Sequence, residues 1–412
     1  MADPTFRVEL LSQSTSAFFN FFIIGESLIG GTDTIPPAAD VWADVSEDVR
    51  SVVISRGRSR DIDNFTAGTC TVRVDNHTRR FDPTNTESDL YGNIEPMRQL
   101  RVTATLGGTD YPLYRGFVQS WDIGITSGFW SEVDIVCADA FSVLANQNMD
   151  AVAEAHDGDL PGVRIGRVLD AAEVAFPAGL RDIDAGLTVL GDTTFGENAL
   201  GYLQKVGQSE PGDLFVTTSG ALRFVERNGR DTTVQATFSD DGADTGYVGI
   251  GQQFDVDLLS NRVRVSGVSG TVQTADDTNS QVTYQVRNLD RTGLLMQSDV
   301  DAASQASFLL GRFARPEFRF SDVSANIVGL SDARAAELLG LELADRVNVE
   351  LTPPGGGAQI VQAALIDRLS WGISSGGRVV SLSASVSAGQ SAVGFVIGDD
   401  QLGVIGKSLI AF

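Results

Sequence analysis

Short runs that alternate apolar and polar residues recur along the whole chain and predict β-strands. The clearest runs cover 7–11, 51–55, 70–74, 100–106, 133–137, 262–265 and 379–383. Alternation places one set of side chains on a buried face and the other in solvent, as in antiparallel sheets. Stretches rich in Gly, Pro, Asp and Ser, such as 107–110 and 353–357, separate the runs and predict turns. The chain is therefore predicted to be mainly β.

A few short helices are predicted between the strands. Apolar residues recur at helical spacing over 165–176, 199–206, 302–313 and 335–339. Thr194 and Glu197 have the spacing of a capping box before the second helix, and Ser331 can cap the fourth. These helices are too short and too few to form a core of their own. We expect them to connect and cover a β framework.

One pattern of strand, turn, strand, Ser-Trp, turn and strand occurs twice. The first copy covers 101–128 and contains Trp121, and the second covers 346–376 and contains Trp371. Such internal similarity indicates two copies of one β domain, with the two tryptophans at equivalent positions. A ring of three chains, each with two similar domains, would then present pseudo-sixfold symmetry.

The repeat defines the expected domain organisation. Two antiparallel β-barrel domains flank a mixed α/β middle segment, and the second barrel contains inserted helices. The expected divisions are an N-terminal barrel domain at 1–150, a middle domain at 151–258, a second barrel domain at 259–388 and a C-terminal interaction tail at 389–412.

Charge and composition exclude several classes of protein. The 412 residues include 54 acidic and 30 basic side chains, for a net charge of −24. Such a chain repels phosphate backbones, so a sequence-reading nucleic-acid binder is not expected. The most apolar stretch is far shorter than the roughly 20 residues of a membrane span, so stable membrane insertion is not expected either. Cys70 and Cys137 lie in strand-like runs and are predicted to be buried free thiols.

The chain is poor in the residues that usually carry catalysis, and we expect no enzyme. His77 and His156 both lie in polar, turn-like segments, and no motif for a zinc protease, a serine hydrolase or a phosphate-binding loop occurs. No catalytic residue, cofactor or resident metal is predicted. Four pairs of aspartates, three adjacent and one separated by a single residue, keep open a carbohydrate-active enzyme or a bound ion in a loop. They are Asp61 with Asp63, Asp240 with Asp241, Asp276 with Asp277, and Asp399 with Asp400.

Two segments are candidates for protein contacts. Arg56, Arg58 and Arg60 form a basic cluster on an acidic chain. Either these arginines pair with adjacent aspartates, or they reach carboxylates on a neighbouring subunit. The apolar, glycine-punctuated C-terminal stretch, with Phe395 and Phe412, either packs on its own domain or adds to a partner's sheet.

Several blocks of the chain resemble tail proteins of long-tailed bacteriophages. The segment from Ser51 to Asn146 is similar to the N-terminal domain of such proteins, and later blocks extend the resemblance over most of the chain. The blocks are 54–60, 65–76, 80–83, 92–98, 113–116, 137–139, 212–224 and 319–387. Together they resemble the baseplate hub, or tail-tip (minor tail), proteins of these phages.

The resemblance implies a structural component of the virion. Hubs of this family are homotrimers with two tail-tube-like β-barrels, which adapt a sixfold tube to a threefold tip. Their implied partners are distal tail and tail-tube proteins, the tape measure protein, and tail fibre or spike proteins, with DNA only in passage through the lumen. The implied location is the distal end of the tail, after assembly in the host cytoplasm. A sixfold distal tail ring protein is the alternative, and a receptor-binding or carbohydrate-active tail protein is a more distant one.

Overall fold

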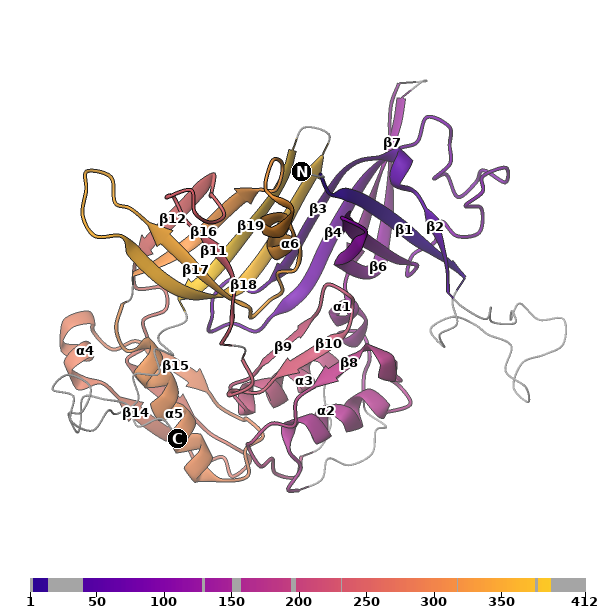
Figure 1. Cartoon of the computed structure of the whole chain (residues 1–412). Coiled ribbons are helices and arrows are strands. Elements are labelled where there is room, and N and C mark those ends of the chain that lie inside the picture. Colours follow the sequence, from indigo (N-terminus) through magenta and orange to yellow (C-terminus); the bar gives the residue numbers. More distant parts are fainter. Residues whose placement is uncertain are drawn as a thin grey trace.

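The computed structural model describes residues 3–13, 40–127, 130–149, 157–193, 198–230, 232–316, 318–374 and 377–386. Strands dominate these ranges, and the helices are short and lie mostly in the lower half of the view (Figure 1). The predicted mainly β fold with a few short helices is confirmed. The predicted interaction tail at 389–412, with Phe395 and Phe412, lies outside the described residues.

Most strands belong to one large sheet. In the described ranges it has 13 strands, eleven of them in one continuous path. The path runs β12 (Gly249–Phe254), β16 (Phe318–Asn326), β19 (Gly377–Val386), β18 (Ile360–Ser374), β3 (Val49–Gly57), β4 (Thr66–Asp75), β7 (Trp130–Ala138), β6 (Thr109–Ser127), β5 (Gln99–Leu106), β1 (Thr5–Gln13) and β2 (Val41–Asp44). Off the path, β11 (Val234–Phe238) pairs with β17 (Arg346–Leu351), which pairs with β18.

The two sequence repeats fold as the same antiparallel meander. The first copy forms β5, β6 and β7, and the second forms β17, β18 and β19. Trp121 lies opposite Ile135 in the first meander, and Trp371 lies opposite Val380 in the second. In each half, one more strand pairs with the third strand of the meander. β4 pairs with β7 in the first half, and β16 pairs with β19 in the second. The strand order β3-β4-β7-β6 of the first half is thus repeated as β12-β16-β19-β18 in the second.

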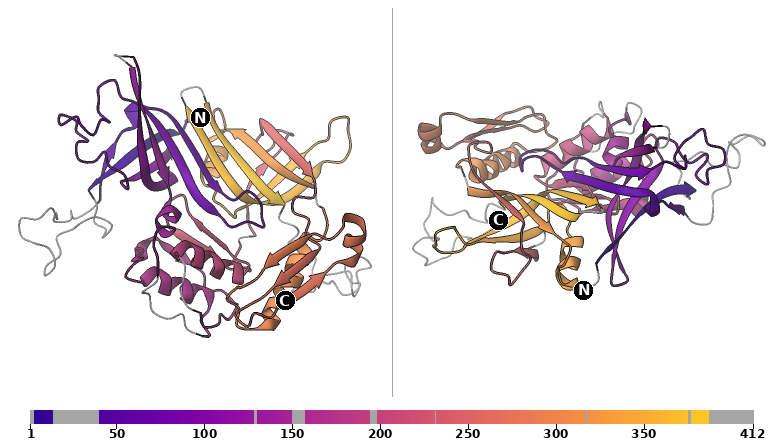
Figure 2. Two further views of the ribbon diagram at one scale, coloured as in Figure 1. Left: turned by 180° about the vertical axis from the view of Figure 1, so that it is seen from behind. Right: turned by 90° about the horizontal axis from the view of Figure 1, so that it is seen from above.

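The two halves are joined edge to edge into one sheet. β3 pairs antiparallel with β18 from Ser51 opposite Ser374 to Gly57 opposite Arg368, and the strands lie side by side in every view (Figures 1 and 2). This differs from the expectation of two separate barrels. The described strands form no closed barrel, because the edge that each half would need for its own closure is taken by the other half.

Two smaller α/β layers lie below the large sheet in Figure 1. The first has sheet order β8-β10-β9, and the second has order β14-β13-β15 and a small core of its own. The first contains α1 (Ala140–Leu144), α2 (Pro161–Asp170), η2 (Ala178–Leu180), β8 (Arg181–Ile183), α3 (Ala199–Ser209), β9 (Asp213–Val216) and β10 (Leu222–Val225). The second contains β13 (Arg262–Val265), β14 (Gln273–Asp276), α4 (Thr278–Tyr284), β15 (Asn288–Arg291) and α5 (Asp299–Phe313).

Strand pairing shows how these layers relate to the expected domains. β11 and β12 come from the expected middle domain, 151–258, yet they pair with strands of the second half of the large sheet. Residues 262–313, expected inside the second barrel domain, form the separate small α/β layer. The chain therefore passes between the large sheet and the smaller layers both before and after residue 258, the expected boundary between the middle domain and the second barrel domain.

Helix ends follow local chemistry. Ser331 caps α6 (Asp332–Leu339) by accepting a hydrogen bond from the Arg334 amide, as predicted. The expected helix over 165–176 ends earlier, since α2 stops at Asp170 and Phe176 is buried in the turns that follow. Asn198 caps α3, accepting from the Gly201 amide, and the predicted capping-box residues 194 and 197 lie outside the described ranges.

The two cysteines are neighbours in the core. Cys70 on β4 lies opposite Cys137 on β7, and both are fully buried free thiols, as predicted. Burial raises the pKa of both thiols, which disfavours the reactive thiolate. Both residues therefore serve as small core side chains.

Gly57 stands where the two halves meet most closely. Its φ of +128° is a conformation that side-chain-bearing residues rarely adopt. A Cβ atom there would lie 2.2 Å from the Asp367 carbonyl oxygen and 2.6 Å from the Arg368 Cα atom, both in the backbone of β18. Close pairing of β3 with β18 therefore requires glycine at this position.

We predict that Gly57→Ala lowers the free energy of unfolding by at least about 2 kcal/mol, because it adds backbone strain to a backbone clash. The matched control is Gly166→Ala in α2, where an added Cβ meets open space. There the better helix propensity of alanine should leave stability unchanged or raise it by up to about 1 kcal/mol. Urea unfolding followed by circular dichroism measures both, and equal stability of the two variants would contradict the prediction.

Candidate functional site

The predicted basic cluster begins in the last residues of β3, continues into the following loop and is turned mostly inward. Arg56 and Arg58 are only 3% and 6% exposed, whereas the side chain of Arg60 is half exposed. Of the two alternatives above, pairing within the chain holds for Arg56 and Arg58, although their partners include distant carboxylates. Carboxylates from distant parts of the same chain surround them, so their charges are neutralised inside the protein.

Arg58 is the centre of a buried ion cluster. Its Nε donates to Asp367 Oδ1 at 2.7 Å, its Nη1 to Asp213 Oδ1 at 3.0 Å, and its Nη2 to Asp61 Oδ1 at 2.7 Å. Its guanidinium also lies 4.5 Å from the centroid of the Phe65 ring. The planar fork of arginine can satisfy three separated carboxylates at once, which the point charge of lysine cannot do.

Two further arginines complete the cluster. Arg230 Nε donates to Asp213 Oδ2 at 2.7 Å, and Arg312 Nη2 lies 2.5 Å from Asp61 Oδ2. Three arginines therefore alternate with three aspartates, and the charges balance. We call Arg58, Arg230, Arg312, Asp61, Asp213 and Asp367 the ion junction.

Charge pairing controls the protonation of the ion junction. Burial by itself would raise the pKa of Asp213, but the charges of Arg230 and Arg58 outweigh it and lower that pKa to about 2. Burial likewise opposes the charge of Arg58, and the three surrounding carboxylates nevertheless raise its pKa. Asp213, Arg58 and Arg230 thus stay ionised at neutral pH.

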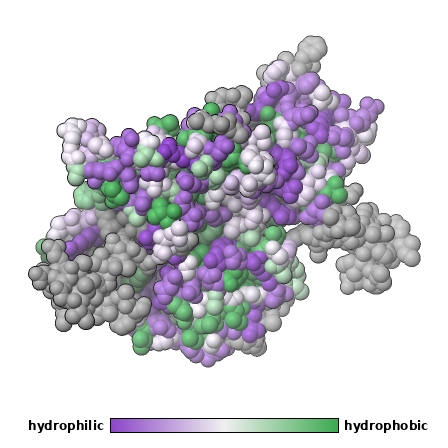
Figure 3. Space-filling view, in the orientation of Figure 1, coloured by the Kyte–Doolittle hydropathy of each residue, from purple (hydrophilic) through white to green (hydrophobic). Residues whose placement is uncertain are grey.

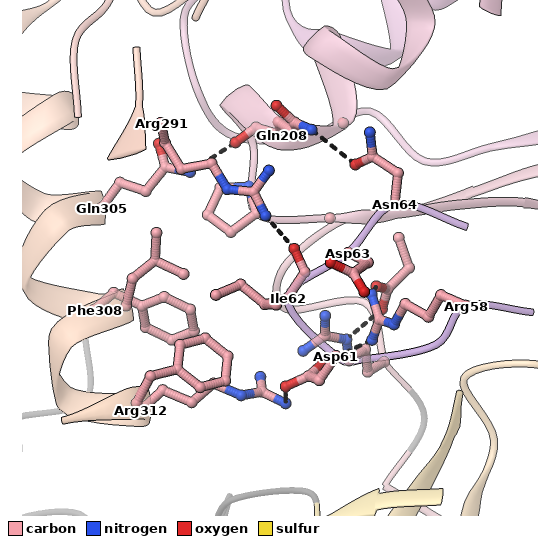
Figure 4. Close-up of a pocket in the computed structure, with 17 residues that line it drawn as sticks. Arg58, Asp61, Ile62, Asp63, Asn64, Gln208, Arg291, Gln305, Phe308 and Arg312 are labelled. Carbon is pink, nitrogen blue, oxygen red and sulfur yellow. Dashed lines mark hydrogen bonds and ion pairs between the residues drawn. The ribbon is translucent and has the colours of Figure 1, made fainter. Parts of the chain in front are cut away.

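The ion junction connects parts of the fold that are far apart in the chain. Arg58 and Asp61 come from the loop after β3, Asp367 from β18, Asp213 from the start of β9, and Arg312 from α5. In Figure 4, Arg58 and Asp61 from the loop and Arg312 from the helix converge at one pocket. The site therefore fixes the large sheet against both smaller layers.

A cavity of about 80 Å³ lies beside the ion junction. Arg291 donates to the Ile62 carbonyl oxygen at its wall (Figure 4). The buried Gln305 Oε1 and Arg312 Nε atoms have no hydrogen-bond partner in the described structure. The space suits one or two water molecules, which such polar atoms bind in protein interiors.

Arg56 makes a second, neighbouring connection. Its Nη2 donates to the Val216 carbonyl oxygen of β9 and to Glu342 Oε1, the latter at 2.7 Å. Glu342 Oε2 accepts in turn from the Thr218 amide at 2.7 Å. Arg60 pairs with Asp63, three residues along the chain and partly in solvent. Of the three predicted arginines, Arg60 alone extends into solvent.

The candidate catalytic groups in the described ranges have structural partners, whereas Asp399 and Asp400 lie outside those ranges. Asp61 belongs to the ion junction, Asp276 pairs with Arg262, and Asp277 caps α4. His77 lies at the surface against Asp75, while the other predicted histidine, His156, is outside the described ranges. Among the residues that the structure describes, no group of three His, Cys, Asp or Glu side chains is arranged to bind a metal ion, and no helix is long and apolar enough to cross a membrane.

Four of the six members of the ion junction could not be found from the sequence. Asp213, Asp367, Arg230 and Arg312 were not singled out, because they are 155, 309, 172 and 254 positions away from Arg58. A usable signal existed only for Asp367, which lies within the apolar strand of the second repeat. Neither spacing nor local composition could have paired it with the first repeat.

Comparison with solved structures shows where this fold has been seen before. The chain is similar to the tail protein from Neisseria meningitidis MC58, with a TM-score of 0.60, 12% identity, and 94% of this chain and 97% of that one covered. It is also similar to the prophage MuSo2 43 kDa tail protein from Shewanella oneidensis, with a TM-score of 0.57, 12% identity, and 93% and 99% covered. The chain has the fold of these tail proteins over nearly its whole length. Neither the models of known protein families nor the curated protein sequences contain a match.

The ion junction predicts a large difference between two adjacent arginines. Arg58→Ala leaves three buried carboxylates without their common partner and should lower the free energy of unfolding by about 3–5 kcal/mol. Arg60→Ala removes one partly exposed pair and should cost less than about 1 kcal/mol. Thermal and urea unfolding of both variants measure the effects. Similar losses in the two would show that Arg58 has no special role.

Asp139 is a buried carboxyl at the end of the first meander. It is 3% exposed, caps α1 through the Phe141 amide at 2.9 Å, and accepts from the Gly68 amide at 2.6 Å. Burial raises its pKa to about 7, against the opposing effect of those two hydrogen bonds and of Arg56. Tyr114, whose own pKa burial raises, donates a hydrogen bond to the carbonyl oxygen of the same Gly68.

The raised pKa of Asp139 predicts a pH-dependent stability. The folded carboxyl keeps its proton up to about pH 7, while the unfolded one loses it near pH 4. The contribution is thus fully present below pH 4 and is lost as pH rises to 7, by at most about 4 kcal/mol. Asp139→Asn keeps the helix cap and should remove this slope. Urea unfolding at several pH values tests it, and parallel profiles for both proteins would contradict it.

Proposed function

We propose that this chain is a structural hub of a phage tail tip that adapts a sixfold tail tube to a threefold tip. The observation that carries the proposal is the internal repeat of the large sheet. Two similar halves, β3-β4-β7-β6 and β12-β16-β19-β18, lie edge to edge in one chain. The full-length similarity of fold to two tail proteins supports the same conclusion.

Symmetry connects the repeat to the adaptor function. Each chain supplies two similar positions, so three chains supply six. A ring of this kind can match a sixfold tube through the repeated halves, while the two smaller layers, which occur once per chain, keep threefold symmetry. A homotrimer is therefore the assembly that uses the duplication.

The proposed partners follow from this position. Distal tail and tail-tube proteins would contact the sixfold face, and fibre or spike proteins the threefold side. The tape measure protein and DNA would pass through the centre. The net charge of −24 favours passage over binding, since acidic surfaces repel the phosphates of DNA. The protein would act without catalysis, at the distal end of the tail in the virion, after assembly in the host cytoplasm.

The mass of the assembled protein tests the proposal. Native mass spectrometry over a range of concentrations should give three copies of the 43.8 kDa chain, about 131 kDa. Six copies, about 263 kDa, would instead support a sixfold distal tail ring, in which one position per chain suffices. A single copy at all concentrations would also contradict the hub.

A further inference from the structure

One strand of the first meander has a half-empty edge. β6 pairs with β7 on one side along 117–127, but on the other side β5 covers only 109–117. Met97 and Arg98 bond to the backbone of Val118 just beyond β5. No strand in the described ranges pairs with the rest of this edge, from residue 120 to 127.

The corresponding edge of the second meander is filled. β17 covers 360–365 of β18, and β3 then covers 368–374 on the same side. Ser370 and Ser55 face one another across this pairing, with their hydroxyl oxygens 3.4 Å apart. The position beside β18 that corresponds to the open edge of β6 is therefore occupied by β3, the outermost strand of the first half.

A second unfilled edge belongs to β12. It is the end strand of the continuous path, and it has the same place in the second half that β3 has in the first. We propose that β12 of one protomer pairs antiparallel with β6 of the next protomer, as β3 pairs with β18 within the chain. This inference rests on the proposed ring and names its interface.

Rows of paired residues across the sheet fix the register. In the first half, one row of paired residues runs from Trp121 through Ile135 and Val72 to Val52. In the second half, the corresponding row runs from Trp371 through Val380 to Ala325. Since Gly249 lies opposite Ser324, this row ends at Val248. Ile54 is two positions beyond the first row, and Ile250 is two positions beyond the second. Since Trp371 lies opposite Ile54, Trp121 should lie opposite Ile250 of the next protomer.

The register brings compatible side chains together. Ile123 would lie opposite Val248, and these side chains are 41% and 70% exposed in the single chain. Asp122 would lie opposite Gly249, so its charge meets no apolar side chain. A slip of one residue would place Asp122 opposite Val248 or Ile250 and turn every side chain to the wrong face. Figure 3 shows apolar residues at the surface near the β12 end of the sheet.

The pairing is head to tail and can close a ring. The edges at β12 and β6 differ, so each protomer offers one of each, and no two identical edges meet. If the junction between protomers copies the junction within the chain, every step from half to half has the same rotation. Six halves from three chains then form one continuous ring of strands, in which the open edges of β12 and β6 are both paired.

Disulfide trapping tests the register. Ser120 and Gly251 are the counterparts of Ser370 and Ser55, so Ser120→Cys with Gly251→Cys should form a disulfide between protomers under mild oxidation. Mixing the two single variants should give linked dimers, whereas each single variant alone should give none. Ser120→Cys with Gln253→Cys, two residues out of register, is the matched control and should link at least tenfold less.

The outcomes separate the inference from the proposed function. Trimers by native mass that do not link through these positions overturn the β12·β6 interface and leave the hub intact. A protein that stays at 43.8 kDa overturns the hub and the interface with it. Equal linking of the control pair also overturns the stated register.

A substitution that places a charge at the interface tests the inference independently. Ile123→Lys should weaken trimer formation at least tenfold while leaving the thermal midpoint of the isolated chain unchanged, because Ile123 is already partly in solvent there. Val361→Lys on β18 is the control, since Val361 is 58% exposed and outside the proposed pairing. A trimer unaffected by Ile123→Lys would overturn the interface.

Discussion

The pairing of β3 with β18 is the constraint on which the rest of the structure depends. Seven residue pairs along it turn two similar halves into one sheet. Gly57 permits the closest approach, where the Arg58 amide donates to the Asp367 carbonyl oxygen at 2.9 Å. The bulge at Asp367 then directs its carboxylate to the Arg58 side chain. Sheet continuity and the buried ion cluster are thus two results of one strand contact.

The ion junction works because its charges balance within a small volume. Removing ions from water costs several kcal/mol each, and only good geometry with full hydrogen bonding offsets that cost. Three arginines and three aspartates offset most of it by pairing with one another, and the cluster holds together elements that apolar packing alone would position less specifically. The chain has 28 arginines but only two lysines, Lys205 and Lys407. Arginine is the better residue for such multiple contacts, so part of this bias has a structural use.

Local and repeated features could be predicted from the sequence, and long-range ones could not. The meanders around Trp121 and Trp371 and the cap at Ser331 follow from patterns within a few tens of residues. The burial of Arg58 depends on Asp213 and Asp367, at separations of 155 and 309 residues, which no local pattern encodes. The joining of both halves into one sheet was missed for the same reason, because the residues of an edge strand do not indicate which distant strand will pair with it.

The distance along the chain between β3 and β18 also determines when the sheet can be completed during synthesis. The hydroxyls of Ser55 and Ser370 meet across 315 positions. At ribosomal rates of about 5–20 residues per second, the outer edge of β3 waits roughly 15–60 s for its partner strand. An unpaired edge is open to wrong association during that time. Nascent chains of this protein therefore need either a temporary cover for that edge or a low local concentration until the last strands emerge.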